Sequence, residues 1–317
     1  MVLVFDRSTQ QGRLELTDRD RFKLLHNMTT QDFNTIKVGE GRSAVLTTAL
    51  ARIIDRVIVY NRGESALMIT NYPAIVRSWL QRHIFFNDKV RLQDVSAAFG
   101  QLEFYGDQAA AIADTFMAGA SKLALHGCAE IEISGEKGMI ARTLPIAGDG
   151  FILIVPMAAL STIKMRLLAQ VGAVEGDAAR YERLRIEAGL AGAPRELSEE
   201  YIPLEAGLWD SVSFHKGCYI GQEIIARMES RQRLAKTLVK LHLTTLPALG
   251  STISLDDRAI GMITSATETE QGSIALGFVK PEFAEAGTQL TVTADGQAPL
   301  TAEVVDAPLL QTGFANA

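Results

Sequence analysis

Cysteine is rare in this sequence, because 317 residues include only Cys128 and Cys218. Two isolated cysteines cannot form the disulfide framework of a small secreted domain. Neither cysteine belongs to a CxxC pair or lies beside a histidine at the spacing of metal ligands. We therefore expect a protein without an intrinsic metal.

Long hydrophobic runs are also missing. The longest apolar stretch, Phe151–Leu160, falls well short of the roughly 20 residues that cross a bilayer, and Pro156 interrupts it. Asp6 and Arg7 follow the first apolar residues at once, which is unlike a secretory or organellar leader. The sequence therefore predicts a protein that does not contact a membrane and is located in the cytoplasm.

Glycine-rich loops that cradle phosphates are absent, since neither GxGxxG nor GxxxxGKS/T occurs. A net charge of -6 and a pI of about 5.5 also argue against a surface that attracts nucleic acid as a whole. The basic stretch Arg227–Lys240 is the exception. Such a run is usually a solvated face, and the alternative is that it contacts an RNA or an acidic protein.

What the sequence does contain is the composition of an ordered globular protein, with 47% hydrophobic and 21% charged residues. Ile53–Tyr60 and Ser65–Thr70 alternate as strands do and are separated by a short polar turn, which predicts an antiparallel hairpin. Pro73–Phe86 has the spacing of an amphipathic helix with Ile75, Trp79, Leu80 and His83 near one face. The fold class indicated by these signals is α+β.

The C-terminal part changes character near Lys236, where the helical signal fades. Short alternating segments separated by turn residues follow, and this spacing is typical of a small antiparallel barrel. We predict an α+β region of two interleaved subdomains at residues 1–235 and a β-barrel domain at residues 236–317. The expected barrel strands are Thr237–Leu243, Thr252–Leu255, Ala259–Ser265, Ser273–Val279, Gln289–Val292 and Thr301–Val305.

Three motifs in a fixed order carry most of the chemical information. They are Tyr181–Gly189 (YERLRIEAG), Ile202–Leu208 (IPLEAGL) and Phe214–Arg227 (FHKGCYIGQEIIAR). Together they resemble the folate-binding glycine-cleavage T-protein superfamily, and the KGCYxGQE form of the third motif is similar to the YgfZ-type branch. Further matching segments extend the resemblance over nearly the whole chain.

This resemblance implies a ring of lobes, with two mixed α/β antiparallel-sheet subdomains, a C-terminal β barrel and a reduced folate such as tetrahydrofolate in a central channel. For the YgfZ-type branch it implies an accessory role in the assembly or repair of iron-sulfur enzymes and, through them, in tRNA modification. One alternative is a folate-dependent aminomethyltransferase or demethylase. Another is a scaffold that has lost its ligand and acts only through protein contacts.

The resemblance also implies roles for individual residues. A carboxylate accepts two hydrogen bonds from the amidine edge of a pterin, and relatives use the glutamate of the Arg-x-Glu-Ala-Gly motif in this way, so Glu187 is the expected pterin anchor. Without the motif, Glu187 would be interpreted as a solvated helix residue paired with Arg183. Asp55 and Asn71 are the other candidate folate contacts, with Asp55 near the middle of the ligand. Arg227 is a further candidate, because it is the basic residue closest to the third motif, and it would meet the folate's glutamate tail or the anionic surface of an RNA or protein partner.

Asp55 is the candidate catalytic carboxylate, because it stands in an otherwise apolar strand where a carboxylate is unusual unless it faces a cavity or a sheet edge. Aminomethyltransferases of the family have a glycine-rich turn and paired aspartates here, whereas this chain has Arg56 after Asp55. A cation beside the folate nitrogen would oppose the iminium-like charge of aminomethyl transfer. The departure therefore argues against that reaction and leaves folate binding unaffected.

Cys218 is the candidate functional thiol. Lys216 lies two residues before it and a helix predicted from Gln222 adds its N-terminal dipole, both of which stabilise a thiolate. Gly217 and Gly221 let the backbone bend tightly and approach a ligand closely. Cys128 adjoins an alternating strand and is expected to be a small core residue. The leading interpretation is thus a folate-binding accessory protein in which Cys218, assisted by Lys216, acts as a redox-active or cluster-handling thiol.

Overall fold

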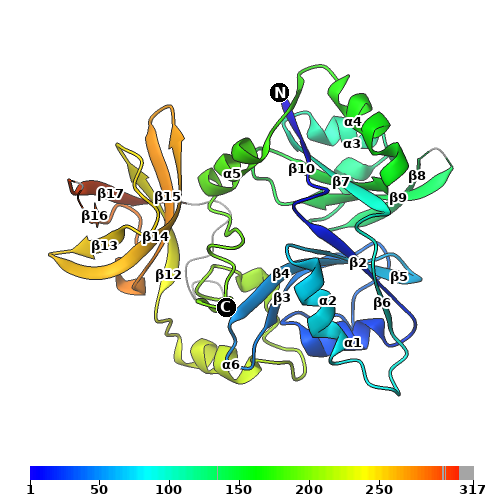
Figure 1. Ribbon diagram of the computed structural model, residues 1–317, viewed down its shortest axis with the longest axis horizontal. Helices are drawn as coiled ribbons and strands as arrows, with labels where there is room; N and C mark the ends of the chain where they lie inside the picture. The colour runs from blue at the N-terminus through cyan, green and yellow to red at the C-terminus, as the bar shows by residue number, and fades with distance from the viewer. Residues whose placement is uncertain (134, 295, 297, 307–317) are drawn as a thin grey trace. The chain divides into compact units, whose positions relative to one another are not determined.

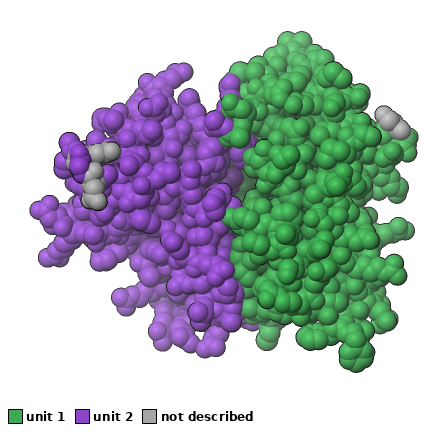
Figure 2. All heavy atoms as spheres, in the orientation of Figure 1, with its two compact units in different colours: residues 1–47, 54–178, 211–220 green, residues 48–53, 179–210, 221–317 purple. Residues whose placement is uncertain are grey.

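The computed structural model describes residues 1–133, 135–294, 296 and 298–306. The chain divides into two compact units, which are coloured separately in Figure 2. Unit 1 comprises residues 1–47, 54–178 and 211–220, and unit 2 comprises residues 48–53, 179–210 and 221–317. Each unit is therefore assembled from segments that are far apart in the sequence.

Unit 1 contains a six-stranded sheet in the order β11-β1-β7-β10-β9-β8 (Figure 1). Neighbouring strands are antiparallel except β1 and β11, which are parallel. The strands are β1 (Val2–Asp6), β7 (Phe99–Gly106), β8 (Cys128–Ile133), β9 (Glu136–Thr143), β10 (Gly150–Pro156) and β11 (Ala173–Glu175). The accompanying helices are α3 (Ala109–Asp114) and α4 (Leu160–Leu168), with short 3₁₀ turns η1 (Ala120–Lys122) and η2 (Met157–Ala159).

A second, five-stranded sheet of unit 1 has the order β3-β4-β5-β2-β6. Its strands are β2 (Gly12–Thr17), β3 (Gly41–Thr47), β4 (Ile53–Asn61), β5 (Ser65–Thr70) and β6 (Arg91–Asp94), and its helices are α1 (Arg21–Met28) and α2 (Pro73–Gln81). The antiparallel pairing of β4 with β5 confirms the predicted hairpin.

Helix α2 is shorter than the sequence pattern predicted. It ends at Gln81, because the backbone N–H of His83 bonds to the carbonyl of Leu80 and closes the tighter turn that commonly ends a helix. Its inner face carries Val76, Trp79 and Leu80, whereas Ile75 is 57% exposed. The predicted position was therefore right for Trp79 and Leu80 and wrong for Ile75.

The two sheets of unit 1 pack against each other and carry helices on their outer faces. Phe151 and Leu153 of β10 pack with α3 and α4, while the alternate residues Ile152 and Ile154 pack with residues of the five-stranded sheet such as Tyr60. Because both faces of β10 are buried, this strand is apolar at every position instead of alternating. The helices α1 and α2 cover the other face of the five-stranded sheet.

Unit 2 contains a closed six-stranded barrel in the order β12-β15-β14-β13-β16-β17. All six predicted barrel strands are present, as β12 (Thr237–Leu243), β13 (Thr252–Leu255), β14 (Arg258–Thr269), β15 (Gly272–Val279), β16 (Gln289–Thr293) and β17 (Leu300–Val305). Helices α5 (Ala178–Glu187) and α6 (Gln222–Arg231) and the short turns η3 (Trp209–Ser211) and η4 (Pro281–Phe283) precede or connect them.

The α+β fold class is confirmed, with two mixed sheet-and-helix layers and a closed C-terminal barrel. The domain boundary near Lys236 and the central folate channel stay predictions. Residues 307–317 of the predicted barrel domain lie outside the described residues.

Candidate functional site

Asp55 lies in β4 and is completely buried. The hydroxyl of Thr70 donates to Oδ2 of Asp55 at 2.5 Å, and the backbone N–H of Asn71 donates to the same oxygen at 2.8 Å. The side-chain amide of Asn71 donates to Oδ1 at 2.7 Å. Burial raises the pKa of Asp55, and these hydrogen bonds oppose the rise because they favour the carboxylate. Asp55 and Asn71, two of the predicted site residues, are thus in direct contact.

Asn71 connects this carboxylate to a second buried carboxylate. Oδ1 of Asn71 accepts a hydrogen bond from Nε2 of Gln11 at 3.2 Å, and Oε1 of Gln11 accepts one from Nε2 of Gln101 at 2.7 Å. The same Nε2 of Gln101 donates to Oε1 of Glu103 at 2.8 Å. A chain of amide hydrogen bonds therefore runs through unit 1 from Asp55 to Glu103.

The two ends of this series donate to carboxylates, because Asn71 donates to Asp55 and Gln101 donates to Glu103, whereas Gln11 in the middle donates to Asn71. Tyr105 adds a hydroxyl donor at 2.5 Å to the other oxygen of Glu103. Among the described residues Oε1 of Gln101 is buried without a hydrogen-bond partner. The side-chain amide of Gln101 is therefore held only by the two hydrogen bonds that its Nε2 donates to Gln11 and Glu103. Sequence reasoning missed Gln101 and Glu103, although their alternation with Leu102 and Phe104 was a signal that β7 has a polar face.

Arg56 follows Asp55 in the chain but lies on the opposite face of β4, since successive side chains of a strand alternate. Asp55 shares its face with Val57, whereas Arg56 donates through Nε to Oγ of Ser43 at 3.0 Å. Burial lowers the pKa of His126 to about 3, and the nearby Arg56 guanidinium contributes to this shift. The positive charge of Arg56 therefore acts on the face of β4 that points away from Asp55.

Glu187 is the last residue of α5 and is partly exposed. Nε of Arg183, one helical turn earlier, donates to Oε1 of Glu187 at 2.7 Å. Nζ of Lys240 donates to the backbone carbonyl of Glu187 at 3.2 Å. The pairing with Arg183 is the arrangement expected of a solvated helix residue. Among the described residues Oε2 accepts no hydrogen bond, so Glu187 retains an acceptor for a ligand.

A buried ion pair fixes the helix that carries Glu187. Nη1 of Arg185 donates to Oε2 of Glu196 at 3.0 Å, and Nη2 donates to Oγ of Ser265 at 2.8 Å. Ser265 in turn donates to Oε1 of Glu196 at 2.6 Å. A Cβ on Gly192 would lie 2.5 Å from the Arg185 guanidinium, so a larger residue there would displace this side chain. The cluster attaches α5 to β14 within unit 2, and sequence reasoning did not identify it.

Lys216 lies on the segment 211–220, which belongs to unit 1 although it follows unit 2 residues in the chain. Its ammonium donates to the backbone carbonyls of His26, Thr29 and Gln31, at 2.7 Å for Thr29 and 3.1 Å for Gln31. These carbonyls belong to the C-terminal end of α1 and the turn after it, where the helix dipole favours a cation. Burial lowers the pKa of Lys216 to about 8.

The two cysteines occupy opposite environments. Cys218 is exposed, whereas Cys128 at the start of β8 is 5% exposed. Burial raises the pKa of the Cys128 thiol to about 11. The predicted accessibility of Cys218 and burial of Cys128 are therefore confirmed. The ammonium of Lys216 is bonded to backbone carbonyls at the end of α1 and in the turn after it, so its assistance to the Cys218 thiol stays a prediction.

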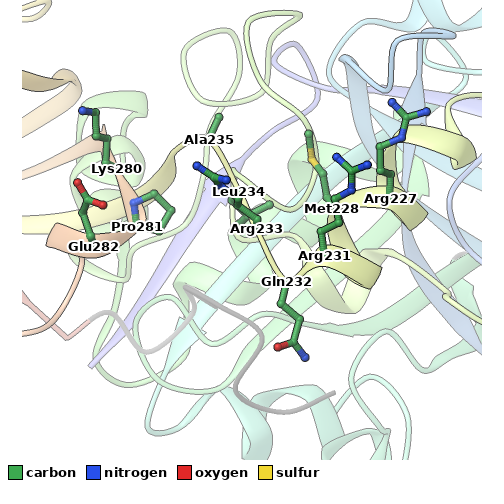
Figure 3. A pocket seen from close by; sticks show the side chains of 10 residues that line it. All are labelled: Arg227, Met228, Arg231, Gln232, Arg233, Leu234, Ala235, Lys280, Pro281 and Glu282. Carbon is green, nitrogen blue, oxygen red and sulfur yellow. The ribbon is translucent and has the colours of Figure 1, made fainter.

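Arg227 is exposed on α6, and its Nη2 donates to Oε1 of Glu223 at 2.7 Å. It also lines a pocket of unit 2 (Figure 3). Across residues 1–306, apart from the three undescribed positions in that range, no cluster of three or more His, Cys, Asp or Glu side chains could hold a metal ion. In the same part of the chain, no helix is long and apolar enough to cross a membrane.

Two family models match the chain. The GCVT N-terminal domain matches residues 1–216, and the glycine cleavage T-protein C-terminal barrel domain matches residues 236–311. These matches cover the α+β part and the barrel respectively.

Individual relatives agree with these matches. A chloroplastic protein of Arabidopsis thaliana that is proposed to be a transferase is 32% identical over 300 residues, which span 93% of this chain and 69% of the relative. An aminomethyltransferase of Rubrobacter xylanophilus is 29% identical, with 96% of this chain and 82% of the relative covered. The crystal structure of glycine cleavage system aminomethyltransferase T from Bartonella henselae has a TM-score of 0.85 at 19% identity, covers 99% of this chain and 87% of that chain, and shows the shared fold.

Proposed function

Because the chain belongs to the glycine cleavage T-protein family, we propose that it binds a reduced folate of the tetrahydrofolate type and acts as an accessory protein of the YgfZ-type branch. In this role it supports the assembly or repair of iron-sulfur enzymes and, through them, tRNA modification. The observation that carries the proposal is the exposed Cys218 thiol on a segment that Lys216 ties to the end of α1. Such a thiol is accessible to a partner protein while its backbone is held in place.

The proposed folate contacts are Glu187, Asn71 and Arg227. Oε2 of Glu187 is an acceptor for the pterin amidine edge, and a charge-assisted bond of this type is stronger than a neutral one. Asp55 already accepts three hydrogen bonds and is buried, so we assign it the role of orienting the Asn71 amide. Arg227 would meet the carboxylates of the folate tail.

Calorimetry tests the folate part of the proposal. Tetrahydrofolate and its 5-formyl derivative are titrated into the wild-type chain and into a Glu187→Gln variant, with Glu130→Gln at an exposed position of β8 as a matched control. Removing the charged acceptor is expected to weaken binding by about tenfold or more, while the control binds like wild type. If neither folate binds the wild-type chain, the folate part of the proposal is wrong. The remaining alternative is then a scaffold that has lost its ligand and acts only through protein contacts.

A cellular assay tests the accessory part. Cells that depend on this chain are supplied with wild type, Cys218→Ser or Cys128→Ser, and the activity of an iron-sulfur enzyme is followed. Loss of activity with Cys218→Ser alone supports a functional thiol. Full activity with Cys218→Ser would make this thiol dispensable, even if folate binds.

Aminomethyl transfer is the second candidate function, and the aminomethyltransferases among the relatives favour it. The enclosed Asp55 argues against it, because a carboxylate with three hydrogen bonds and no exposed surface is poorly placed to stabilise charge on a substrate. With tetrahydrofolate and an aminomethylated lipoyl carrier protein supplied, we expect negligible release of ammonia and methylene-tetrahydrofolate. Rapid release of ammonia and methylene-tetrahydrofolate would instead show that the protein is an aminomethyltransferase.

A further inference from the structure

A pocket of about 690 Å³ lies within unit 2 (Figure 3). Figure 3 shows the α6 side chains Arg227 and Arg231 on one side and Arg233 in the middle. The other side carries Lys280, Pro281 and Glu282. Pockets that bind small molecules have volumes of roughly 300 to 1,000 Å³. The size of this pocket therefore suits a small organic ligand and exceeds the need of a single inorganic ion.

The lining is strongly cationic. Arg227, Arg231, Arg233 and Lys280 oppose the single carboxylate of Glu282, so the local charge is four minus one, or +3. The whole chain has a net charge of -6, so this concentration of positive charge is local. Arg227 pairs with Glu223, whereas the other three cations have no ion pair in the described part of the chain. Three charged groups are thus available to a ligand.

The pocket also has an apolar part. Leu234 is 7% exposed, and Met228 and Pro281 complete this part of the wall. Single-stranded nucleic acids are usually held by stacking of bases on aromatic side chains. None of the ten described lining residues is aromatic, so the pocket is better suited to a compact ligand than to an RNA strand.

We propose that this pocket binds a small organic polyanion, with its clustered phosphate or carboxylate groups on Arg231, Arg233 and Lys280 and its carbon skeleton on Met228 and Leu234. Guanidinium groups present paired N–H donors that match the oxygens of both anionic groups. Three cations that have no ion pair among the described residues select ligands with two or more negative groups over single carboxylates. The proposal extends beyond folate binding and does not require it.

Calorimetry at about 0.1 M salt, where long-range charge attraction is largely screened, tests this site. Adenosine triphosphate, inorganic triphosphate and citrate are each titrated into the wild-type chain. Adenosine triphosphate is expected to bind more tightly than inorganic triphosphate, because it also covers the apolar wall. Citrate binding without adenosine triphosphate binding would assign the polyanion to the carboxylate class.

Variants locate the binding in the pocket. Arg231→Gln, Arg233→Gln and Lys280→Gln are each expected to weaken binding by about tenfold or more, since each removes a charge-assisted hydrogen bond. Arg258→Gln removes the same charge from an exposed position of β14 outside the pocket and should leave binding unchanged. Arg231→Lys keeps the charge but loses the paired donors, so it should also weaken binding. Thermal unfolding of each variant checks that it is folded.

The proposal is overturned if none of the small polyanions binds, or if Arg258→Gln weakens binding as much as the pocket variants. If inorganic triphosphate binds as tightly as adenosine triphosphate, the apolar residues Met228 and Leu234 do not contribute to binding, and this part of the proposal is wrong. A ten-nucleotide single-stranded RNA that binds where the small ligands do not would identify a nucleic-acid surface instead. Tetrahydrofolate titrations of the same three variants separate this site from folate binding, which they should not affect.

Discussion

At the scale of single residues, burial gives the thiols of Cys128 and Cys218 different reactivity. A thiol of pKa about 11, as in Cys128, is ionised in about one molecule in a thousand at pH 8, and it is also shielded from reagent. We predict that iodoacetamide at pH 8 labels Cys218 at least about 100-fold faster than Cys128, as followed by mass spectrometry. Cys218→Ser should remove the fast reaction, and equal rates for the two cysteines would contradict the structure.

The amide chain between Asp55 and Glu103 supplies a second prediction at this scale. Gln101→Leu keeps the side-chain volume but removes the donor shared by Gln11 and Glu103, and an unsatisfied buried acceptor costs about 1–3 kcal/mol. Urea unfolding should therefore show a loss of about 2 kcal/mol in unfolding free energy. Gln93→Leu, at an exposed position of β6, should change it by less than about 0.5 kcal/mol. A similar loss of unfolding free energy in both variants would mean that the amide hydrogen bonds of Gln101 make no specific contribution to stability.

At the scale of elements, Lys216 ties the segment 211–220 to the end of α1, and its titration affects stability. Its pKa is lowered from 10.5 to about 8 in the folded state. Between pH 8 and 10.5 the unfolded chain therefore binds a proton that the folded chain does not, so the stability contributed by Lys216 rises with pH across this window. Urea unfolding of wild type and Lys216→Met at pH 7 and pH 10 measures this effect.

The difference between wild type and Lys216→Met should shift in favour of wild type at the higher pH. Lys23→Met, on an exposed position of α1, serves as the matched control and should show no such shift. A difference that shifts in favour of the variant would contradict the burial of the Lys216 ammonium.

At the scale of the whole molecule, the buried His126 should make the free energy of unfolding fall in acid. Burial keeps this histidine neutral with a pKa of about 3, against 6.5 in the unfolded chain. Between pH 6.5 and 3 only the unfolded chain binds the proton, so stability falls as pH falls, by at most about 1.4 kcal/mol per pH unit. His126→Asn should flatten this slope by about one proton, and asparagine tolerates the positive φ of 60° at this position. An unchanged slope in urea unfolding at pH 4 to 7 would contradict the prediction.

The fold and the candidate site differ in how well the sequence predicted them. The barrel strands were recognised because each has one face toward a core and is bounded by turn residues, so a local period of two identifies them. The C-terminal end of α2 and the partners of Asp55 were not recognised, because they depend on contacts with residues outside the local pattern. Gln101 and Glu103 were missed for the same reason, since buried polar residues resemble exposed ones in sequence.

The sequence by itself determined the α+β class, the barrel strands, the motif order that marks the family, and the contrast between Cys128 and Cys218. Only the tertiary structure decided that Asn71 orients toward Asp55, that the Lys216 ammonium bonds to carbonyls at the end of α1, and that separate basic residues of unit 2 share one pocket. The physical reason is that sequence periodicity reports which face of an element is buried, whereas hydrogen-bond partners are set by packing. Lys216 and His26, which bond directly, are 190 residues apart in the chain.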